Sequence, residues 1–211
     1  MEQNQHLEDL AKIRSLMEKS TRFLSLSGLS GVFAGLYALA GSWVAHSYLH
    51  SSEFISAYAQ LVHPLQLNGI LMHYSFFLIL AIAVAGSSIL TGIIFTFRKA
   101  RKRGDTIWNR SSKRMATNLT IPLLAGAVFC LQLINLGLPG LVGPALLIFY
   151  GLALINGSKY TLEDIRYLGI IEVALGLANL FFIGWGLYFF AIGFGILHIV
   201  YGVYMYYKYE A

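Results

Sequence analysis

Six long apolar runs, joined by short polar connections, constrain this chain more than any other feature. They span residues 23–45, 70–97, 119–137, 141–155, 167–183 and 187–207. A helix that crosses the hydrocarbon core of a bilayer needs about 20 apolar residues. The 211 residues are 57% hydrophobic and 12% charged, whereas soluble domains average about 45–50% apolar and about 25% charged residues. We therefore expect an all-α fold, an integral membrane bundle of six transmembrane helices.

Residues 1–22 differ in character from the rest of the chain. Apolar side chains recur there at helical spacing between charged ones, at Leu7, Leu10, Ile13, Leu16 and Met17. This pattern predicts an amphipathic helix that is cytoplasmic or lies on the membrane surface. The alternative is a solvated leader into the first span. Residues 23–211 would then form the six-helix transmembrane domain.

The positive charges predict the orientation of the six spans. All 15 Lys and Arg residues lie in the N-terminal segment, in the connections after the second and fourth spans, and at the C-terminus. The connections after the first, third and fifth spans carry none. Because Lys and Arg near span ends stay in the cytoplasm, we expect a multi-pass membrane protein with both termini cytoplasmic.

Two stretches carry a resemblance to a known group of proteins. They are IRSLMEKSTRFLSLSGLSG (13–31) and IGFGILHIVYGVYMYYKYE (192–210). The chain resembles a family of small, uncharacterised bacterial inner-membrane proteins to which no activity is assigned. The resemblance implies a membrane location and a similar length, and it carries over no site residues.

Glu172 is the only acid inside an apolar run, and His198 is the only histidine well inside one. An ionised carboxylate that faces lipid is costly, so Glu172 should face the bundle interior, be protonated or be paired. The last two spans are consecutive and antiparallel, which puts Glu172 and His198 within about one helical turn in depth. The functional interpretation is a proton, cation or ligand site formed by this pair. The structural interpretation is a polar clasp between helices, with His198 bonding a backbone carbonyl.

Asn179 and Gln132 add two amide side chains to this hypothesis. Both lie in the outer halves of their spans. Amide hydrogen bonds between membrane helices contribute ~0.6 kcal/mol each, so these side chains serve either as helix contacts or as the lining of a polar cavity.

A separate hypothesis concerns the outer connection after the first span. His46, His50 and Glu53 are spaced i, i+4 and i+7, so they share one helical face if the first span continues past Ala45. Two imidazoles and a carboxylate are ligands that zinc and copper accept. The alternative is a hydrated loop at the membrane surface, with no cofactor.

The basic stretch 98–114 has a membrane explanation. Positive charges beside span ends contact anionic lipids of the inner leaflet, and only Trp108 interleaves with them, so we expect no nucleic-acid partner. The sequence contains no nucleophile, zinc-protease or nucleotide-binding motif, so we do not expect an enzyme.

Two classes of function remain. The first is transport, a channel or sensing of a small solute, ion or proton through a polar site near Glu172 and His198. The second is a non-catalytic structural or signalling role, in which small-residue helix faces such as Ser27, Gly31 and Gly35 bind partners or form a homo-oligomer.

Overall fold

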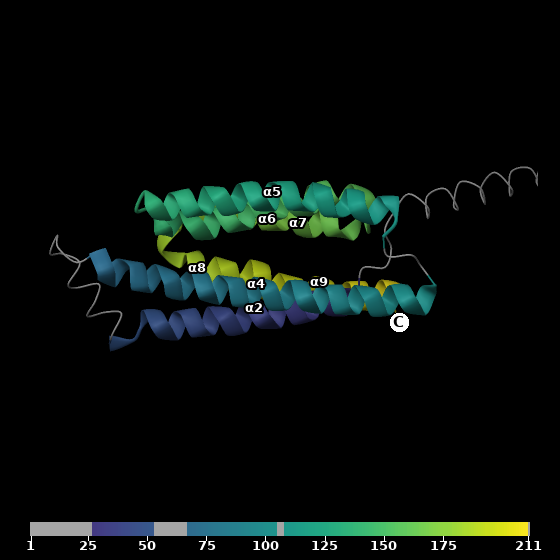
Figure 1. Cartoon of the computed structure of the whole chain (residues 1–211), viewed down its shortest axis with the longest axis horizontal. Coiled ribbons are helices and arrows are strands. Elements are labelled where there is room, and N and C mark those ends of the chain that lie inside the picture. The colour runs from purple at the N-terminus through teal and green to yellow at the C-terminus, as the bar shows by residue number, and fades with distance from the viewer. Residues whose placement is uncertain (1–26, 53–66, 105–107, 211) are drawn as a thin grey trace, which may run out of the picture. The chain divides into compact units, whose positions relative to one another are not determined.

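The computed structural model describes residues 27–52, 67–104 and 108–210, and these residues form helices and turns with no strand among them (Figure 1). The predicted amphipathic segment 1–22 lies outside the described residues. The helices, in chain order, are α2 (Gly28–Leu49), α4 (Leu67–Arg103), α5 (Arg110–Asn135), α6 (Val142–Gly157), α7 (Asp164–Asn179), α8 (Gly186–Phe190) and α9 (His198–Tyr209).

Short segments of other helical types connect several of these elements. Three-residue 3₁₀ helices precede α6 and α8 and follow α6; they are η1 (Pro139–Leu141), η2 (Ser158–Tyr160) and η3 (Ile183–Trp185). A π-helical segment, η4 (Ala191–Leu197), joins α8 to α9. The last predicted span is therefore one continuous helical stretch with a wider turn in its middle.

Within the described ranges, five helical stretches are long and apolar enough to cross a membrane. They are Gly28–Leu49, Ser75–Lys102, Arg110–Asn135, Pro139–Tyr160 and Ile183–Tyr209. The remaining predicted span corresponds to α7, which has 16 residues. At 1.5 Å per residue α7 is about 24 Å long, shorter than the ~30 Å hydrocarbon core.

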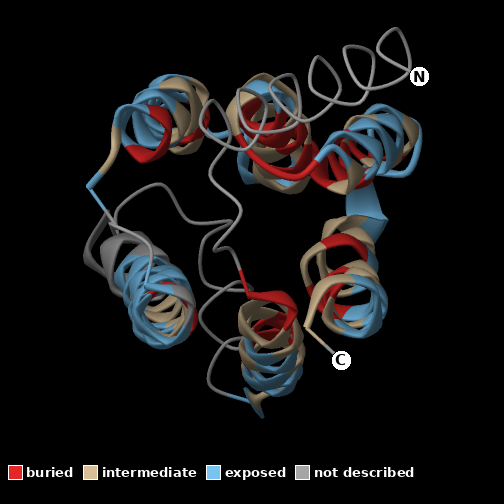
Figure 2. Cartoon of the chain, turned by 90° about the vertical axis from the view of Figure 1, so that its right-hand side faces the viewer, coloured by how far each residue is buried: buried red, intermediate tan, exposed pale blue. Residues whose placement is uncertain are grey.

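The surface of these helices is strongly apolar. On α4, Ile79, Ile82 and Ile89 each expose more than three-fifths of their side chains, and Val128 on α5 is 67% exposed. In Figure 2 several of the helices carry buried residues on one side and exposed residues on the other. Isolated large apolar residues are common on soluble proteins, but many exposed on helices of membrane length favour a membrane-facing surface. The described residues thus have the character of a membrane helical bundle.

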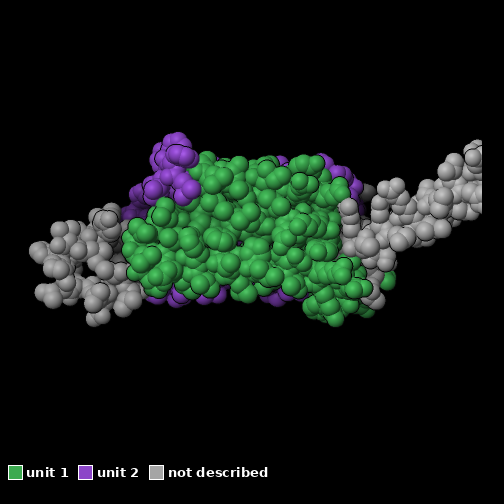
Figure 3. Space-filling model, turned by 90° about the horizontal axis from the view of Figure 1, so that it is seen from above, with its two compact units in different colours: residues 1–26, 96–178 green, residues 27–95, 179–211 purple. Residues whose placement is uncertain are grey.

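The chain divides into two compact units, which Figure 3 shows in different colours. The first contains the end of α4, α5, α6 and all of α7 except its last residue, Asn179. The second contains α2, most of α4, Asn179, α8, η4 and α9. The second unit is therefore built from the two ends of the described chain.

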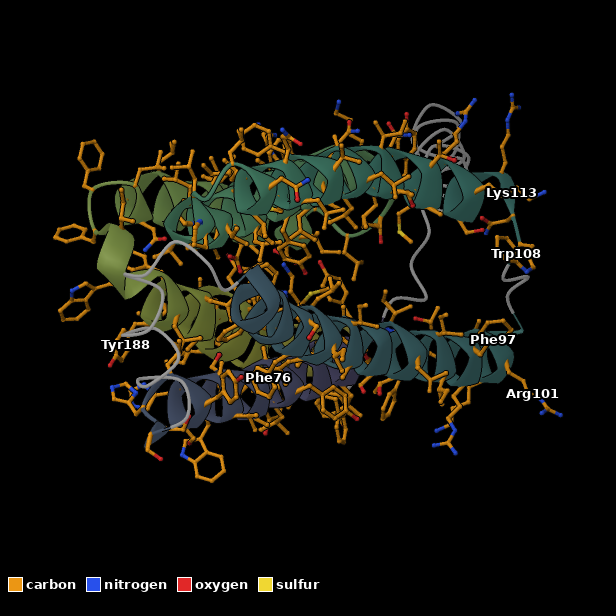
Figure 4. All side chains as sticks on the ribbon, turned by 60° about the vertical axis from the view of Figure 1, so that its left-hand side comes forward. Phe76, Phe97, Arg101, Trp108, Lys113 and Tyr188 are labelled. Atoms are coloured by element: carbon orange, nitrogen blue, oxygen red, sulfur yellow. The ribbon has the colours of Figure 1, made fainter. Side chains whose placement is uncertain are left out.

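In the second unit, α2 has a different kind of contact on each of two sides. Glycines meet α9 on one side: a Cβ atom on Gly28 would lie 2.5 Å from the carbonyl oxygen of Gly202. Aromatic pairs meet α4 on the other, with Tyr48 stacked on Phe76 at 3.8 Å between ring centroids (Figure 4). These two contact modes place α2 at the centre of its unit.

Candidate functional site of buried polar groups

One face of α7 carries two buried polar side chains. Glu172 and Asn179 are both 0% exposed. They are seven residues apart, so they lie on the same side of the helix and about 10 Å apart along its axis. The other buried residues of α7 share this side and are Ile165, Leu168, Gly169 and Gly176. Burial is one of the outcomes expected for Glu172, and its side chain is buried in the structure.

Glycines bring the backbone of α7 into direct contact with α6. A Cβ atom on Gly151 would lie 2.5 Å from the carbonyl oxygen of Gly169, and one on Gly169 would lie 2.7 Å from that of Gly151. One turn beyond Glu172, a Cβ atom on Gly176 would lie 2.9 Å from the carbonyl oxygen of Pro144. Glu172 therefore lies between two points where the helix backbones touch.

The side chain that accompanies Glu172 comes from α6. Tyr150 lies close enough to Glu172 for the two groups to interact electrostatically. In the sequence, Tyr150 directly precedes the contact residue Gly151. An apolar run does not reveal which side of a helix faces its neighbour, so the sequence alone did not identify Tyr150. The carboxyl group of Glu172 and the phenol group of Tyr150 are thus within electrostatic range of each other in the first unit.

Asn179 is the last residue of α7, and its side-chain amide can accept a further hydrogen bond. Its Nδ2 donates to the carbonyl oxygen of Phe182 at 3.4 Å. Its Oδ1 is buried and has no hydrogen-bonding partner within the described ranges. Buried amide oxygens are usually satisfied, so this atom can accept from a water molecule or a solute. Gln132 is different: its side chain is exposed on α5, and the structure does not bring it to the buried face of α7.

His198 lies in the second unit and is 7% exposed. Its Nδ1 lies 2.9 Å from the carbonyl oxygen of Gly193, and the ring of Phe194 stacks on the imidazole at 5.9 Å and 14°. Glu172 belongs to the first unit, so the pairing of Glu172 with His198 stays a prediction.

His46 and His50 are neighbours at the C-terminal end of α2. Their ring centroids are 4.2 Å apart, and His50 Nδ1 lies 2.8 Å from the carbonyl oxygen of His46. The condition that α2 continues past Ala45 is met. Glu53, the third predicted ligand, lies outside the described residues, and the ranges that are described hold no group of three metal-ligating side chains.

The basic stretch forms one end of the first unit. Figure 4 shows Arg101, Trp108 and Lys113 there. Asn109 begins α5 as its N-cap, because its side-chain oxygen accepts from the Ser112 backbone N–H at 2.7 Å. Trp108 is 72% exposed, so an aromatic side chain stands among exposed cations beside a membrane-length helix.

Comparison of the chain with protein-family models, with curated proteins and with solved structures finds no match.

Proposed function

We propose that this chain is a six-span protein of the cell inner membrane with both termini cytoplasmic. Five membrane-length stretches support five spans. We propose α7 as the sixth, since it occupies the predicted position and is exposed at Ile170 and Leu177. Six spans also leave all 15 Lys and Arg residues on one side.

We propose further that the protein transports, conducts or senses a small solute, ion or proton through its buried polar groups. The observation that carries this proposal is the complete burial of Glu172 at the glycine contact of α6 and α7. Ionisable residues inside membrane spans are costly to keep and commonly mark ion and proton pathways. The role is non-catalytic and requires no cofactor.

The residues around Glu172 suit a proton or a cation. A carboxyl group exchanges a proton or offers two oxygen ligands, and Tyr150 adds a hydroxyl group beside it. On the same face, Asn179 Oδ1 is a hydrogen-bond acceptor. All of these groups offer oxygen atoms. Oxygen atoms bind hard cations and proton donors rather than anions.

Proton flux into proteoliposomes tests this proposal. The full chain is reconstituted with an entrapped pH dye, and a potassium diffusion potential drives the flux. We expect flux above that of protein-free vesicles, lost in Glu172→Gln, which keeps the shape and hydrogen bonding of the side chain without its titratable proton. Glu163→Gln is the matched control, because Glu163 is exposed and should leave the flux unchanged.

The same vesicles show which ion the protein transports. If protons do not move, sodium and potassium uptake is measured with the same two variants. Wild-type vesicles that pass none of the three ions faster than protein-free vesicles would contradict an ion pathway. Equal flux in the wild type and in Glu172→Gln would remove Glu172 from it.

A structural or signalling role is the second candidate, and α4 favours it. Its membrane-length stretch has no buried residue in its most apolar window, and a Cβ atom on Gly86 or Gly92 would meet nothing within 4 Å. The small residues of α2 already contact α9, so an oligomer would use α4 instead. Single-molecule photobleaching in nanodiscs, with Gly92→Leu as the variant, tests this candidate.

A further inference from the structure

Two helix crossings, one in each compact unit, have the same geometry. The first crossing is that of α6 with α7, and the second crossing is that of α2 with η4 and α9. In each, two glycines meet backbone to backbone: Gly151 and Gly169 in the first crossing, Gly28 and Gly202 in the second. A Cβ atom on either glycine of a pair would lie 2.5 or 2.7 Å from the carbonyl oxygen of the other. The two units therefore contain the same close contact.

The agreement extends to a third glycine on α7 and on α2, seven residues after the paired one. A Cβ atom on Gly176 would lie 2.6 Å from Ile148 Cγ1, and one on Gly35 would lie 2.6 Å from Ile199 Cγ1. Each isoleucine stands three residues before the paired glycine of its own helix. One constant shift in numbering from α2 to α7, and another from α9 to α6, thus relates these glycine contacts.

The sequences of the crossing helices agree under the same two shifts. Residues 28–36 read GLSGVFAGL and residues 169–177 read GIIEVALGL, with two glycines, a valine and a leucine in common. Residues 144–151 read PALLIFYG and residues 195–202 read GILHIVYG, with leucine, isoleucine, tyrosine and glycine in common. Apolar composition accounts for shared aliphatic residues, but the shared glycines lie where the helix backbones touch.

The position of Glu172 in the first crossing corresponds to Gly31 in the second. A Cβ atom on Gly31 would lie 3.3 Å from Gly202 Cα and 3.4 Å from the carbonyl oxygen of His198. These distances are longer than those at the paired glycines, so this position accommodates the start of a side chain. In the first crossing it carries a fully buried carboxyl group. The second crossing has the same glycine contacts with no side chain there.

The tyrosine of the candidate site, in contrast, occurs in both crossings. Tyr150 corresponds to Tyr201, and each directly precedes a paired glycine. A residue that both crossings contain is explained by their common packing. The acid of the first crossing is not explained in this way.

We propose that the two crossings are copies of one helix-crossing repeat, and that Glu172 makes the first copy a binding site for a proton or a hard cation rather than holding α6 to α7. Internal repeats with weak sequence symmetry are common in transporter folds, and ionisable residues inside spans commonly mark ion pathways. The binding role of Glu172 rests on the proposed function, whereas the repeat does not.

An exchange of the repeated sequence tests the repeat. In the full chain, residues 169–177 are replaced by GLSGVFAGL, the sequence of residues 28–36. The matched control carries the same insert one position earlier, on residues 168–176, which puts leucine at both glycine contacts. We expect the chimera to fold and to unfold at a clearly higher temperature in detergent than the control. A chimera that was no more stable than the control would overturn the repeat.

Two substitutions test whether the acid serves binding or packing. Glu172→Met keeps a side chain of similar length without its carboxyl group, and Glu172→Gln keeps hydrogen-bonding atoms without the titratable proton. We expect both variants to unfold at the wild-type temperature or above, since burial of a carboxyl group is unfavourable, and both to lose the ion flux. Glu163→Met, at an exposed position, is the matched control. Strong destabilisation in Glu172→Met alone would overturn the binding role in favour of a polar clasp.

The two readouts separate this inference from the proposed function. Wild-type vesicles without ion flux would contradict the proposed function and remove the binding role of Glu172, while the stability of the chimera would still support or overturn the repeat. A stable Glu172→Met variant that kept the flux would overturn the binding role alone.

Discussion

The carboxylate of Glu210, next to the last residue of the chain, accepts a hydrogen bond from the backbone N–H of Gly28, the first residue of α2, at 2.5 Å. The same carboxylate accepts from the hydroxyl of Ser27 at 3.1 Å. Ser27 occupies the N-cap position of α2 without capping it by its own side chain. An acid from the opposite end of the sequence therefore supplies the cap, and its charge suits the positive end of the helix dipole.

Loss of this cap should weaken the second unit. We expect Glu210→Ala to cost about 0.5–2 kcal/mol, the usual range for a lost N-cap, and Glu210→Gln to cost less because it keeps an acceptor. The measurement is thermal unfolding in detergent. Glu163→Ala removes an exposed acid and serves as the control. Equal unfolding temperatures for Glu210→Ala and the wild type would contradict the capping role.

The helix contacts predict opposite effects for chemically identical substitutions. Gly151→Ala places a methyl group 2.5 Å from the carbonyl oxygen of Gly169, and overpacking of this kind costs about 1–3 kcal/mol. Gly86→Ala meets nothing within 4 Å and should be neutral or slightly stabilising, because Ala favours helices. Unfolding temperatures of the two variants, compared with the wild type, check this. A tolerated Gly151→Ala would mean that α6 and α7 do not touch at this point.

The charge distribution predicts the topology. A reporter fused after Ala211 or inserted at residues 105–107 should be cytoplasmic, and one at Ser52 should be on the outer side. Paired alkaline phosphatase and green fluorescent protein fusions at the three positions measure this. A cytoplasmic Ser52 would remove one span from the proposal and reverse the side of every later connection.

The metal-site hypothesis at the outer end of α2 makes a sharp prediction. Gently purified protein should carry close to one zinc or copper ion per chain, and His50→Ala should lose it. His6→Ala is the control, since His6 belongs to the predicted cytoplasmic segment. Elemental analysis without metal in the wild type would contradict the site and leave the hydrated-loop interpretation.

The basic end of the first unit should bind anionic lipid. Lys113 and Arg114 are exposed beside Trp108, and each cation near a charged leaflet contributes about 1 kcal/mol. We expect the double variant Lys113→Gln, Arg114→Gln to retain less phosphatidylglycerol in native mass spectrometry. The control is the double variant Lys159→Gln, Arg166→Gln, which removes equal charge elsewhere. If both double variants retained the same amount of phosphatidylglycerol, lipid binding would depend on total charge and not on the position of Lys113 and Arg114.

Much of the helical layout was predictable because apolar runs of membrane length have few alternatives to helix. The run 187–207 becomes the continuous stretch from Gly186 to Tyr209. The second helix continues through the basic residues to Arg103 rather than ending at Phe97. Lys and Arg are good helix formers, so a change in polarity did not mark its end.

The details of the candidate site were less accessible to sequence reasoning. That Glu172 is buried follows from the cost of charge in lipid, but its neighbour Tyr150 depends on helix rotation, which composition does not encode. The π-helical segment has no signature within a uniformly apolar run. The contact of Glu210 with Gly28 joins residues 182 positions apart, and no local pattern reports it.

The arrangement of α2 between α4 and α9 has a consequence for synthesis. A ribosome releases α2 before α4 to α8, so the glycine face of α2 has no α9 to meet until α9 itself has been made. The first unit is contiguous from α5 to α7 and can close earlier. Assembly of the second unit is thereby coupled to the synthesis of α9, and a product terminated before α9 would expose an unmatched helix to quality-control proteases.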